Sequence, residues 1–313
     1  MIVSPSAPCR KLSRGSLALA LACGVVGCDP NVVIGSKYRV SEGGTGATGG
    51  SGPSPAGAGG ATVGGGGTGE LGGDAGMAGG AGAGGEPDDG ILWSADHEAG
   101  SLVEWDEGPD ADAGGYYADG ESPAYVSEPA HSGNGSAQAT IDTAADTGAG
   151  QIARLYRRIE TREGYYSAWF NLAEDHIPSA WWSIFLFRAV KDRNASQDLW
   201  SVNLTRTDAD ELTLSLYDHV SGKTTAAPSP PPIVPIEEWF QLQAYLEQSY
   251  DEPSHLIVWL NGARVFELTN AASPPEAQPV YWVIGNGGAK LTPPISTVYV
   301  DDAVISSTLI EPP

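Results

Sequence analysis

The chain has 313 residues and a formal net charge of −23, from 16 Lys and Arg against 39 Asp and Glu. Nucleic-acid binding depends on many contacts between basic side chains and phosphates, so this acidic balance argues against DNA or RNA as a partner. All three cysteines lie within the first 28 residues, which excludes a cysteine nucleophile or cysteine metal site from the rest of the chain.

The N-terminal segment has the pattern of an export signal. Three basic residues between positions 10 and 14 precede an apolar run at 16–26, which is shorter than the roughly 20 residues needed to span a bilayer. The run ends in the sequence VVGC at Cys28, which resembles the bacterial lipobox. The resemblance implies a signal peptide at 1–27 and lipidation of Cys28. Cys23 is an alternative lipidation site, and an ordinary cleaved signal peptide is the remaining alternative.

A lipidated Cys28 would make the protein an exported lipoprotein of the bacterial cell envelope, at the outer membrane or the cell surface. More than one acyl chain gives stable attachment, so contact with the membrane is expected through the lipid anchor only. Residues 28–90 are predicted to be a disordered tether, because glycine fills 22 of the 43 positions from 43 to 85. The glycine doublets there neither follow a predicted strand nor open a helix, so nothing indicates a phosphate loop or an organic cofactor.

Residues 91–313 are predicted to form one all-β domain. Short segments with apolar and polar side chains in alternation are separated by turn residues such as Asn261-Gly262. This pattern predicts two antiparallel sheets packed as a β-sandwich or jelly roll. The predicted strands lie at 136–142, 152–157, 164–170, 181–188, 199–205, 212–217, 239–246, 256–260, 264–268, 280–284 and 297–305.

Five segments of this domain resemble, in order, motifs of the heparin-lyase-I-like polysaccharide lyases, within the concanavalin A-like lectin/glucanase superfamily. They are 96–105 (DHEAGSLVEW, against DFESGDLSGW), 131–140 (HSGNGSAQAT), 164–173 (GYYSAWFNLA), 181–187 (WWSIFLF) and 299–305 (YVDDAVI). The resemblance implies a concanavalin A-like jelly roll over essentially all of 91–313. It also implies that the partner of the domain is a polysaccharide.

Alternation along the strands predicts which aromatic side chains leave the core. Sugar rings stack on aromatic side chains through their C–H faces, while polar groups fix their orientation. We expect an outward-facing aromatic floor for glycan binding, gathered on one concave sheet, made by Tyr165, Trp169, Trp182 and Tyr245. Arg188 is expected on the same face of its strand as Trp182 and Leu186. For Trp169 and Trp182, a place in the core is the alternative.

Catalysis is a second hypothesis for the same sheet. A lyase needs a group that neutralises the uronate carboxylate, a base that removes the proton at C5, and an acid for the leaving oxygen. Arg188 or Asn203 could neutralise the uronate carboxylate. His219 could be the base, and Tyr217, two residues earlier on the same strand face, could be the acid. However, lyases of this superfamily commonly carry glutamine and histidine in the strand that matches 181–190, where this chain has Leu186 and no histidine.

Other enzyme classes and metals leave weaker signals. The sequence has no Glu-x-Asp-x-x-Glu pattern for a retaining glycosidase, so an active enzyme would be a polysaccharide lyase working by β-elimination. If the terminal strands pair, Glu98, Asp301 and Asp302 should meet, and such carboxylates suit a structural calcium ion. Surface acids that cap strands are the alternative to calcium.

Three functional hypotheses follow from the sequence. The first is a cell-envelope lipoprotein whose lyase-like jelly roll binds polysaccharide without cleaving it. The second is an anchored polysaccharide lyase that cleaves a uronate-containing glycan. The third is a structural or adhesive surface protein in which the sandwich serves only as a spacer.

Overall fold

The computed structural model describes residues 90–105, 113–118, 122–145, 150–192, 195–249, 253–271 and 278–311. The predicted signal peptide, Cys28 and nearly all of the predicted tether lie outside these residues. Within them, no helix is long and apolar enough to cross a membrane. Their regular structure is β-strand, apart from the short 3₁₀ helices η1 (Val103–Trp105) and η2 (Thr143–Ala145).

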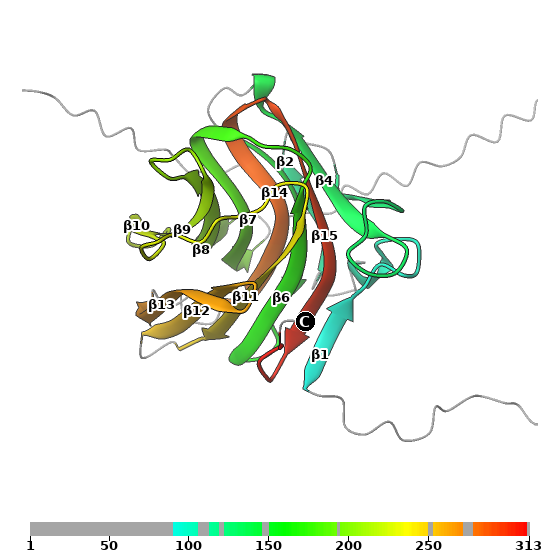
Figure 1. The fold of residues 1–313 in the computed structure, drawn as a ribbon. Coiled ribbons are helices and arrows are strands. Elements are labelled where there is room, and N and C mark those ends of the chain that lie inside the picture. The colour runs from blue at the N-terminus through cyan, green and yellow to red at the C-terminus, as the bar shows by residue number, and fades with distance from the viewer. Residues whose placement is uncertain are drawn as a thin grey trace, which may run out of the picture.

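The strands form two antiparallel sheets, which confirms the predicted sandwich (Figure 1). Sheet A has eight strands, in the order β13-β12-β11-β6-β15-β4-β3, with β1 paired to β15. Its strands are β1 (Ile91–Ala95), β3 (Ala124–Val126), β4 (Ser136–Asp142), β6 (Glu163–Leu172), β11 (Trp239–Glu247), β12 (Ser254–Leu260), β13 (Ala263–Ala271) and β15 (Ile295–Ser306).

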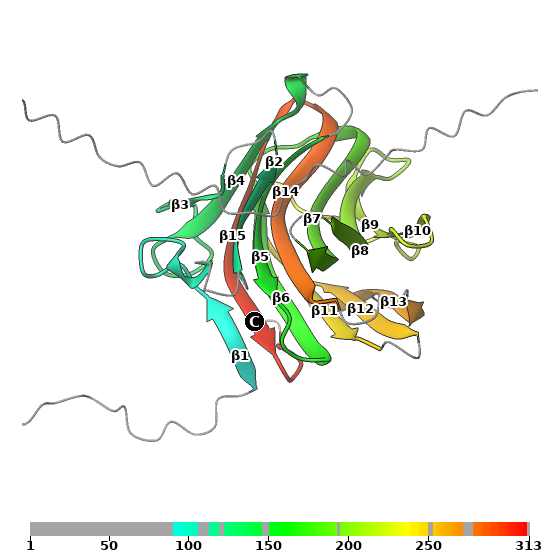
Figure 2. The ribbon, with the colours of Figure 1, turned by 180° about the vertical axis from the view of Figure 1, so that it is seen from behind.

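Sheet B has seven strands, in the order β10-β9-β8-β7-β14-β5-β2, and the view from behind shows β5 beside β14 (Figure 2). Its strands are β2 (Ala113–Ala118), β5 (Gln151–Arg158), β7 (Ile177–Asp192), β8 (Ala195–Arg206), β9 (Leu212–Asp218), β10 (Lys223–Ala226) and β14 (Val280–Thr292). Every strand predicted from the sequence falls within an observed strand, whereas β1, β2, β3 and β10 were not predicted. These four are short and lack a clear two-residue alternation.

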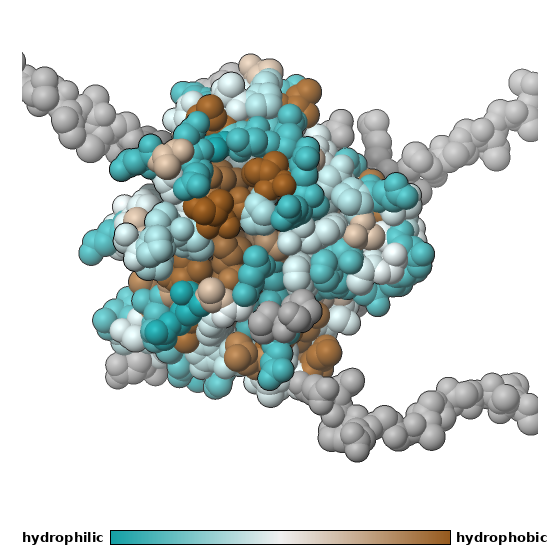
Figure 3. Space-filling model, in the orientation of Figure 1, coloured by the Kyte–Doolittle hydropathy of each residue, from teal (hydrophilic) through white to brown (hydrophobic). Residues whose placement is uncertain are grey.

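The core lies between the two sheets and is rich in aromatic side chains. Trp105, Trp200, Trp282 and Phe170 are at most 1% exposed. Burying a large apolar side chain contributes about 1.5–3 kcal/mol, so this layer supplies the main force that holds the sheets together. On the surface, hydrophilic side chains predominate in the view of Figure 3, with hydrophobic surface gathered in a hollow near its middle.

The first and last strands of the described domain lie side by side. β1 pairs with β15 through partners such as Ala95 and Ala303, with one register shift. The end of β15 and the start of β1 are neighbours in both ribbon views (Figures 1 and 2). The expected pairing of the terminal strands is therefore present, and it brings the opening and closing sequence motifs together.

Candidate functional site

The predicted site residues divide between the two sheets. We call the face of each sheet that is turned away from the other sheet its outer face. Phe187, Trp200 and Leu216 point into the core, so their neighbours along the strands point to the outer face of sheet B. The catalytic candidates therefore share one face of the adjacent strands β7, β8 and β9, or of the turn after β9: Arg188, Asn203, Tyr217 and His219.

The aromatic candidates lie elsewhere. Tyr165 and Trp169 are on β6 and Tyr245 is on β11, and these are strands of sheet A. Their side chains are half-buried and alternate with core residues such as Phe170, so they lie on the outer face of sheet A. The prediction that the aromatic floor and the polar residues share one concave sheet is therefore wrong: the sandwich places them on opposite faces of the molecule.

Trp182 requires a further correction, because it does not face outward. It is 0% exposed in the core, and its indole nitrogen donates a hydrogen bond of 2.9 Å to the side-chain oxygen of Asn286. The register of β7 shifts at a bulge between Ser183 and Phe185. A bulge inserts one residue and reverses the faces of all that follow. Arg188 therefore shares its face with Leu186 but not with Trp182.

We call the polar residues on the outer face of sheet B the sheet B cluster: Arg154, Ser183, Arg188, Asp198, Ser201, Asn203, Tyr217 and His219. Within this cluster, Arg188 on β7 forms an ion pair with Asp198 on β8, and the two residues are direct partners across the strands. Burial alone would raise the pKa of Asp198. The charge of Arg188, its hydrogen bond, and the charges of His219 and Arg154 together lower that pKa instead. Asp198 is therefore a carboxylate at neutral pH.

His219 lies directly after β9 and is held from two sides. Its backbone amide donates to the Leu199 carbonyl at 3.0 Å, and its ring Nε2 is 3.0 Å from the Ser201 hydroxyl. The ring centroid of Tyr217 is 4.6 Å away, with the rings edge to face. Burial lowers the pKa of His219 and, together with the positive charges of Arg154 and Arg188, outweighs the opposing effect of Asp198 and Asp218. The imidazole is therefore neutral at neutral pH and keeps a lone pair.

Arg154 belongs to this site although it was not among the candidate residues predicted from the sequence. It lies on β5, is 2% exposed, and donates from Nη2 to the Ser183 carbonyl at 3.1 Å. The guanidinium covers Gly287 so closely that a Cβ there would be 2.4 Å from Nη2. Alternation along 152–156 could have revealed Arg154, since Ala153 and Leu155 point into the core.

An apolar strip crosses the same face. Tyr217, Ser201, Leu186, Val283 and Tyr156 are successive partners across β9, β8, β7, β14 and β5. Leu186 and Val283 are buried against Tyr156 in a small cluster separate from the main core. The middle of this face is thus a buried apolar layer. The accessible groups beside it are the half-buried Asn203, Tyr217 and His219, which are polar and aromatic side chains of the kind that bind a sugar chain.

The residues predicted to bind calcium meet in a different place, which we call the motif cluster. Asp301 on β15 is 0% exposed. It accepts hydrogen bonds from the His97 ring at 3.1 Å, from the His131 amide at 2.9 Å, and from the amides of Ser132 and Asp302. Because the Trp105 indole donates to His97 Nε2 at 3.1 Å, the proton of His97 is on Nδ1, the nitrogen facing Asp301.

Asp302 and Glu98 complete the motif cluster. Asp302 bonds the ring of His131 at 2.6 Å and the hydroxyl of Ser132 at 2.9 Å. Glu98 accepts from the backbone and side chain of Asn134, at 2.7 and 2.8 Å. Protein donors thus occupy the carboxylate oxygens that were predicted to hold calcium. Across the described ranges, no group of three or more His, Cys, Asp or Glu side chains is placed to hold a metal ion.

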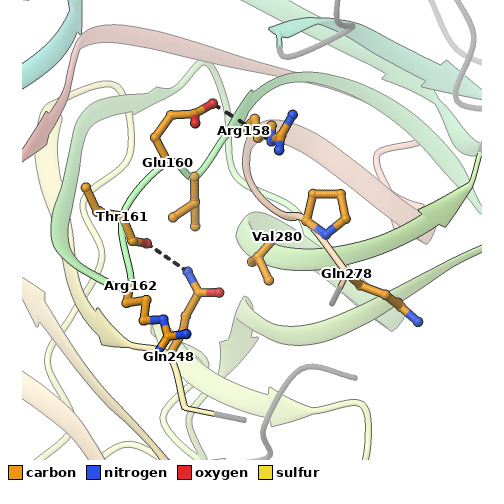
Figure 4. A pocket seen from close by; sticks show the side chains of 9 residues that line it. Arg158, Glu160, Thr161, Arg162, Gln248, Gln278 and Val280 are labelled. Carbon is orange, nitrogen blue, oxygen red and sulfur yellow. Dashed lines mark hydrogen bonds and ion pairs between the residues drawn. The ribbon is translucent and has the colours of Figure 1, made fainter. Parts of the chain in front are cut away.

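A pocket of about 330 Å³ lies apart from every predicted site residue (Figure 4). The β5–β6 turn, the residue after β11 and the start of β14 line it. Gln248 donates to the Thr161 carbonyl at 3.3 Å, and the exposed Arg158 and Glu160 are 3.8 Å apart. These polar groups are bonded to one another, so the pocket gives no reason to move the candidate site away from sheet B.

Comparisons with known proteins support the fold. No protein-family model matches the sequence, and no curated protein matches it. A solved endo-β-1,4-glucuronan lyase from the fungus Trichoderma reesei is similar with a TM-score of 0.53 and 15% identity, over 71% of this chain and 98% of that chain. An alginate lyase from Aplysia kurodai has a TM-score of 0.46 and 9% identity, over 70% of this chain and 99% of that one. Both of these structural neighbours are polysaccharide lyases, and at 15% identity the likeness to the glucuronan lyase establishes the jelly-roll fold alone.

Proposed function

We propose that this protein binds a polysaccharide on the outer face of sheet B. The observation that carries the proposal is the sheet B cluster itself: buried guanidinium groups and half-buried Asn203, Tyr217 and His219 surround an apolar strip on adjacent strands. Tyr217 offers a stacking surface there, and Asn203 and His219 offer directed polar groups. Uronate polymers are the first class to test, because guanidinium groups pair well with carboxylates and the similar fungal structure is a glucuronan lyase.

Affinity electrophoresis of the full chain tests this binding. Glucuronan or alginate cast into a native gel should slow the protein, and Tyr217→Ala should abolish the effect. Tyr165→Ala, on the other sheet, is the matched control and should still be slowed. If neither polymer slows the protein, or if both variants behave alike, the outer face of sheet B is not the binding site, and the spacer hypothesis gains support.

Cleavage by β-elimination is a second candidate, favoured by the neutral His219 beside Tyr217. Arg188 or the half-buried Asn203 would bind the uronate carboxylate, and His219 would remove the C5 proton. The C4–O bond would then break as the C4=C5 double bond forms, with Tyr217 donating a proton to the leaving oxygen. Retaining glycoside hydrolysis is not proposed, because it needs two carboxyl groups about 5–5.5 Å apart and Asp198 is paired with Arg188.

The two candidates differ in their product. Elimination creates an unsaturated sugar that absorbs in the ultraviolet, whereas binding does not. An absorbance increase with glucuronan that disappears in Tyr217→Phe and His219→Ala would establish the lyase. Slowed migration without any absorbance change would leave binding as the function.

We also propose that Cys28 anchors the protein to the cell envelope through lipid. The support is the sequence of the N-terminal segment, in which the basic and apolar stretches lead directly to VVGC. Membrane fractionation of the expressing bacterium provides the test. Cys28→Ala should move the protein out of the membrane fraction, whereas Cys23→Ala should leave it there. The opposite result would identify Cys23 as the anchor.

A further inference from the structure

The outer face of sheet A carries an aromatic surface that the sheet B cluster does not use. Tyr165 on β6 and Tyr245 on β11 are direct partners across the strands, with ring centroids 5.0 Å apart. Trp259 on β12 lies 6.3 Å from Tyr165, and all three side chains are half-buried. With Gln243 they form what we call the sheet A patch. Large aromatic side chains side by side on an open sheet face offer a platform for a flat apolar ligand.

Gln243 lies at the centre of the sheet A patch and is unsatisfied. It is the cross-strand partner of Ser167 on one side and Trp259 on the other. The side chain is 3% exposed, yet within the described part of the chain its carbonyl oxygen accepts no hydrogen bond. By contrast, Gln241 on the same face donates to the Ser167 hydroxyl at 3.0 Å. A buried acceptor left unpaired is costly, so a ligand hydroxyl that reached it would bind favourably.

The unpaired charges around the patch are negative, because Arg264, the cross-strand partner of Trp259, forms an ion pair with Glu267 at 2.6 Å. Glu163 and Glu247 are exposed and face each other across the ends of β6 and β11. Partial burial and the negative charges of these two carboxylates raise the pKa of Tyr245 to about 12. A uronate polymer would meet repulsion here, whereas neutral hydroxyl groups could donate hydrogen bonds to the carboxylates.

We propose that the sheet A patch is a second carbohydrate-binding surface, which takes an uncharged polysaccharide chain. The C–H faces of the sugar rings stack on Tyr165, Tyr245 and Trp259, and ligand hydroxyls reach the Gln243 carbonyl and the flanking glutamates. This surface is on the opposite side of the sandwich from the sheet B cluster and differs from it in charge. The protein would thus hold two kinds of glycan at once, one on each outer face.

Affinity electrophoresis of the full chain tests the proposal with three neutral probes: hydroxyethyl cellulose, xyloglucan and galactomannan. Carboxymethyl cellulose is the charged counterpart of the first. We expect at least one neutral polymer to slow the protein. Trp259→Ala and Tyr245→Ala should each weaken the apparent affinity roughly tenfold, which corresponds to about 1.4 kcal/mol. His219→Ala on sheet B should bind as the unaltered chain does, and circular dichroism would verify that each variant is folded.

Several results would overturn the proposal. The first is that none of the three neutral probes slows the protein. The second is that a folded Trp259→Ala or Tyr245→Ala variant is slowed as much as the unaltered chain. The third is a preference for carboxymethyl cellulose that these variants lose. Light scattering that showed a dimer which Trp259→Ala dissociates would assign the patch to a second copy of the chain instead. Since the probes are neutral and the control lies on sheet B, failure here leaves uronate binding on sheet B unaffected.

Discussion

Asp301→Asn is the substitution that most directly tests how the sandwich is closed. The carboxylate of Asp301 lies in the motif cluster and is fully buried. It accepts hydrogen bonds from His97 and His131, so it joins β15 to the segments that follow β1 and β3. Asparagine has nearly the same shape, so the change removes charge and acceptor capacity without leaving a cavity. The expected effect is therefore electrostatic rather than steric.

The magnitude follows from the hydrogen bonds. Oδ1 accepts from the His97 ring and the Asp302 amide, and Oδ2 accepts from the amides of His131 and Ser132. Asparagine keeps one oxygen and places an NH₂ group at the other position. In either orientation of the amide, this NH₂ group faces two N–H donors and loses both hydrogen bonds. Bonds to charged groups contribute about 1.5–3 kcal/mol each, and we expect the free energy of unfolding to fall by about 3–5 kcal/mol.

Urea denaturation followed by tryptophan fluorescence measures this loss. Asp302→Asn is the matched control, because the Asp302 side chain is 26% exposed and, within the described part of the chain, bonds the side chains of His131 and Ser132. It should cost about 1 kcal/mol or less. Equal losses for the two variants, or a loss below about 1 kcal/mol for Asp301→Asn, would refute the assignment of Asp301 as the buried link between the chain ends.

Three other predictions concern stability. Gly133→Ala should lower the free energy of unfolding by about 1–3 kcal/mol, because a Cβ would lie 1.9 Å from Glu98 Oε1 and the φ angle is +57°. Gly100→Ala should cost less, because its φ angle is +70° but nothing lies within 4 Å of its Cβ; a larger loss for Gly100→Ala would contradict the packing argument. Because the folded pKa of His219 is lowered, the stability it confers is complete above its ordinary pKa of about 6.5 and is lost as pH falls through the folded value. The stability difference between about pH 8 and about pH 5, which bracket the ordinary pKa, should therefore shrink in His219→Gln. An unchanged difference would show that His219 does not contribute to the pH dependence of stability. Since protein donors occupy the carboxylates of the motif cluster, the melting temperature should be the same in excess calcium and in EGTA, whereas a rise with calcium would support the ion predicted from the sequence.

Strand alternation predicted the burial of several strands correctly. In β6, Tyr165 and Trp169 leave the core as predicted, and Tyr166 and Phe170 beside them are buried. In β8 and β9, the outward-facing Asn203 and Tyr217 lie next to the buried Val202 and Leu216. These strands are regular over the positions concerned, so a period of two holds along them. In β7 the period breaks at the bulge, and no pattern in an apolar run such as 181–187 marks the position of that extra residue.

The motif cluster brings together three of the five segments that resemble lyase motifs. The opening segment contributes His97 and Glu98, the second contributes His131 to Asn134, and the closing one contributes Asp301 and Asp302. Their contacts span up to 204 residues of sequence. The residue types suggested a metal site, but only their positions in space show that the acids meet hydrogen-bond donors.

The sequence by itself determined that the domain is an all-β sandwich, where most strands lie, and which side chains leave the core along the regular strands. Only the tertiary structure decided that Tyr165 and Tyr245 face one way while Tyr217 and His219 face the other. The physical reason is that alternation tells the two faces of a strand apart but does not tell which sheet the strand joins. β6 pairs with β11 and β15, whereas β8 pairs with β7 and β9, and these long-range hydrogen bonds assign the aromatic and the polar candidates to opposite sides of the same core.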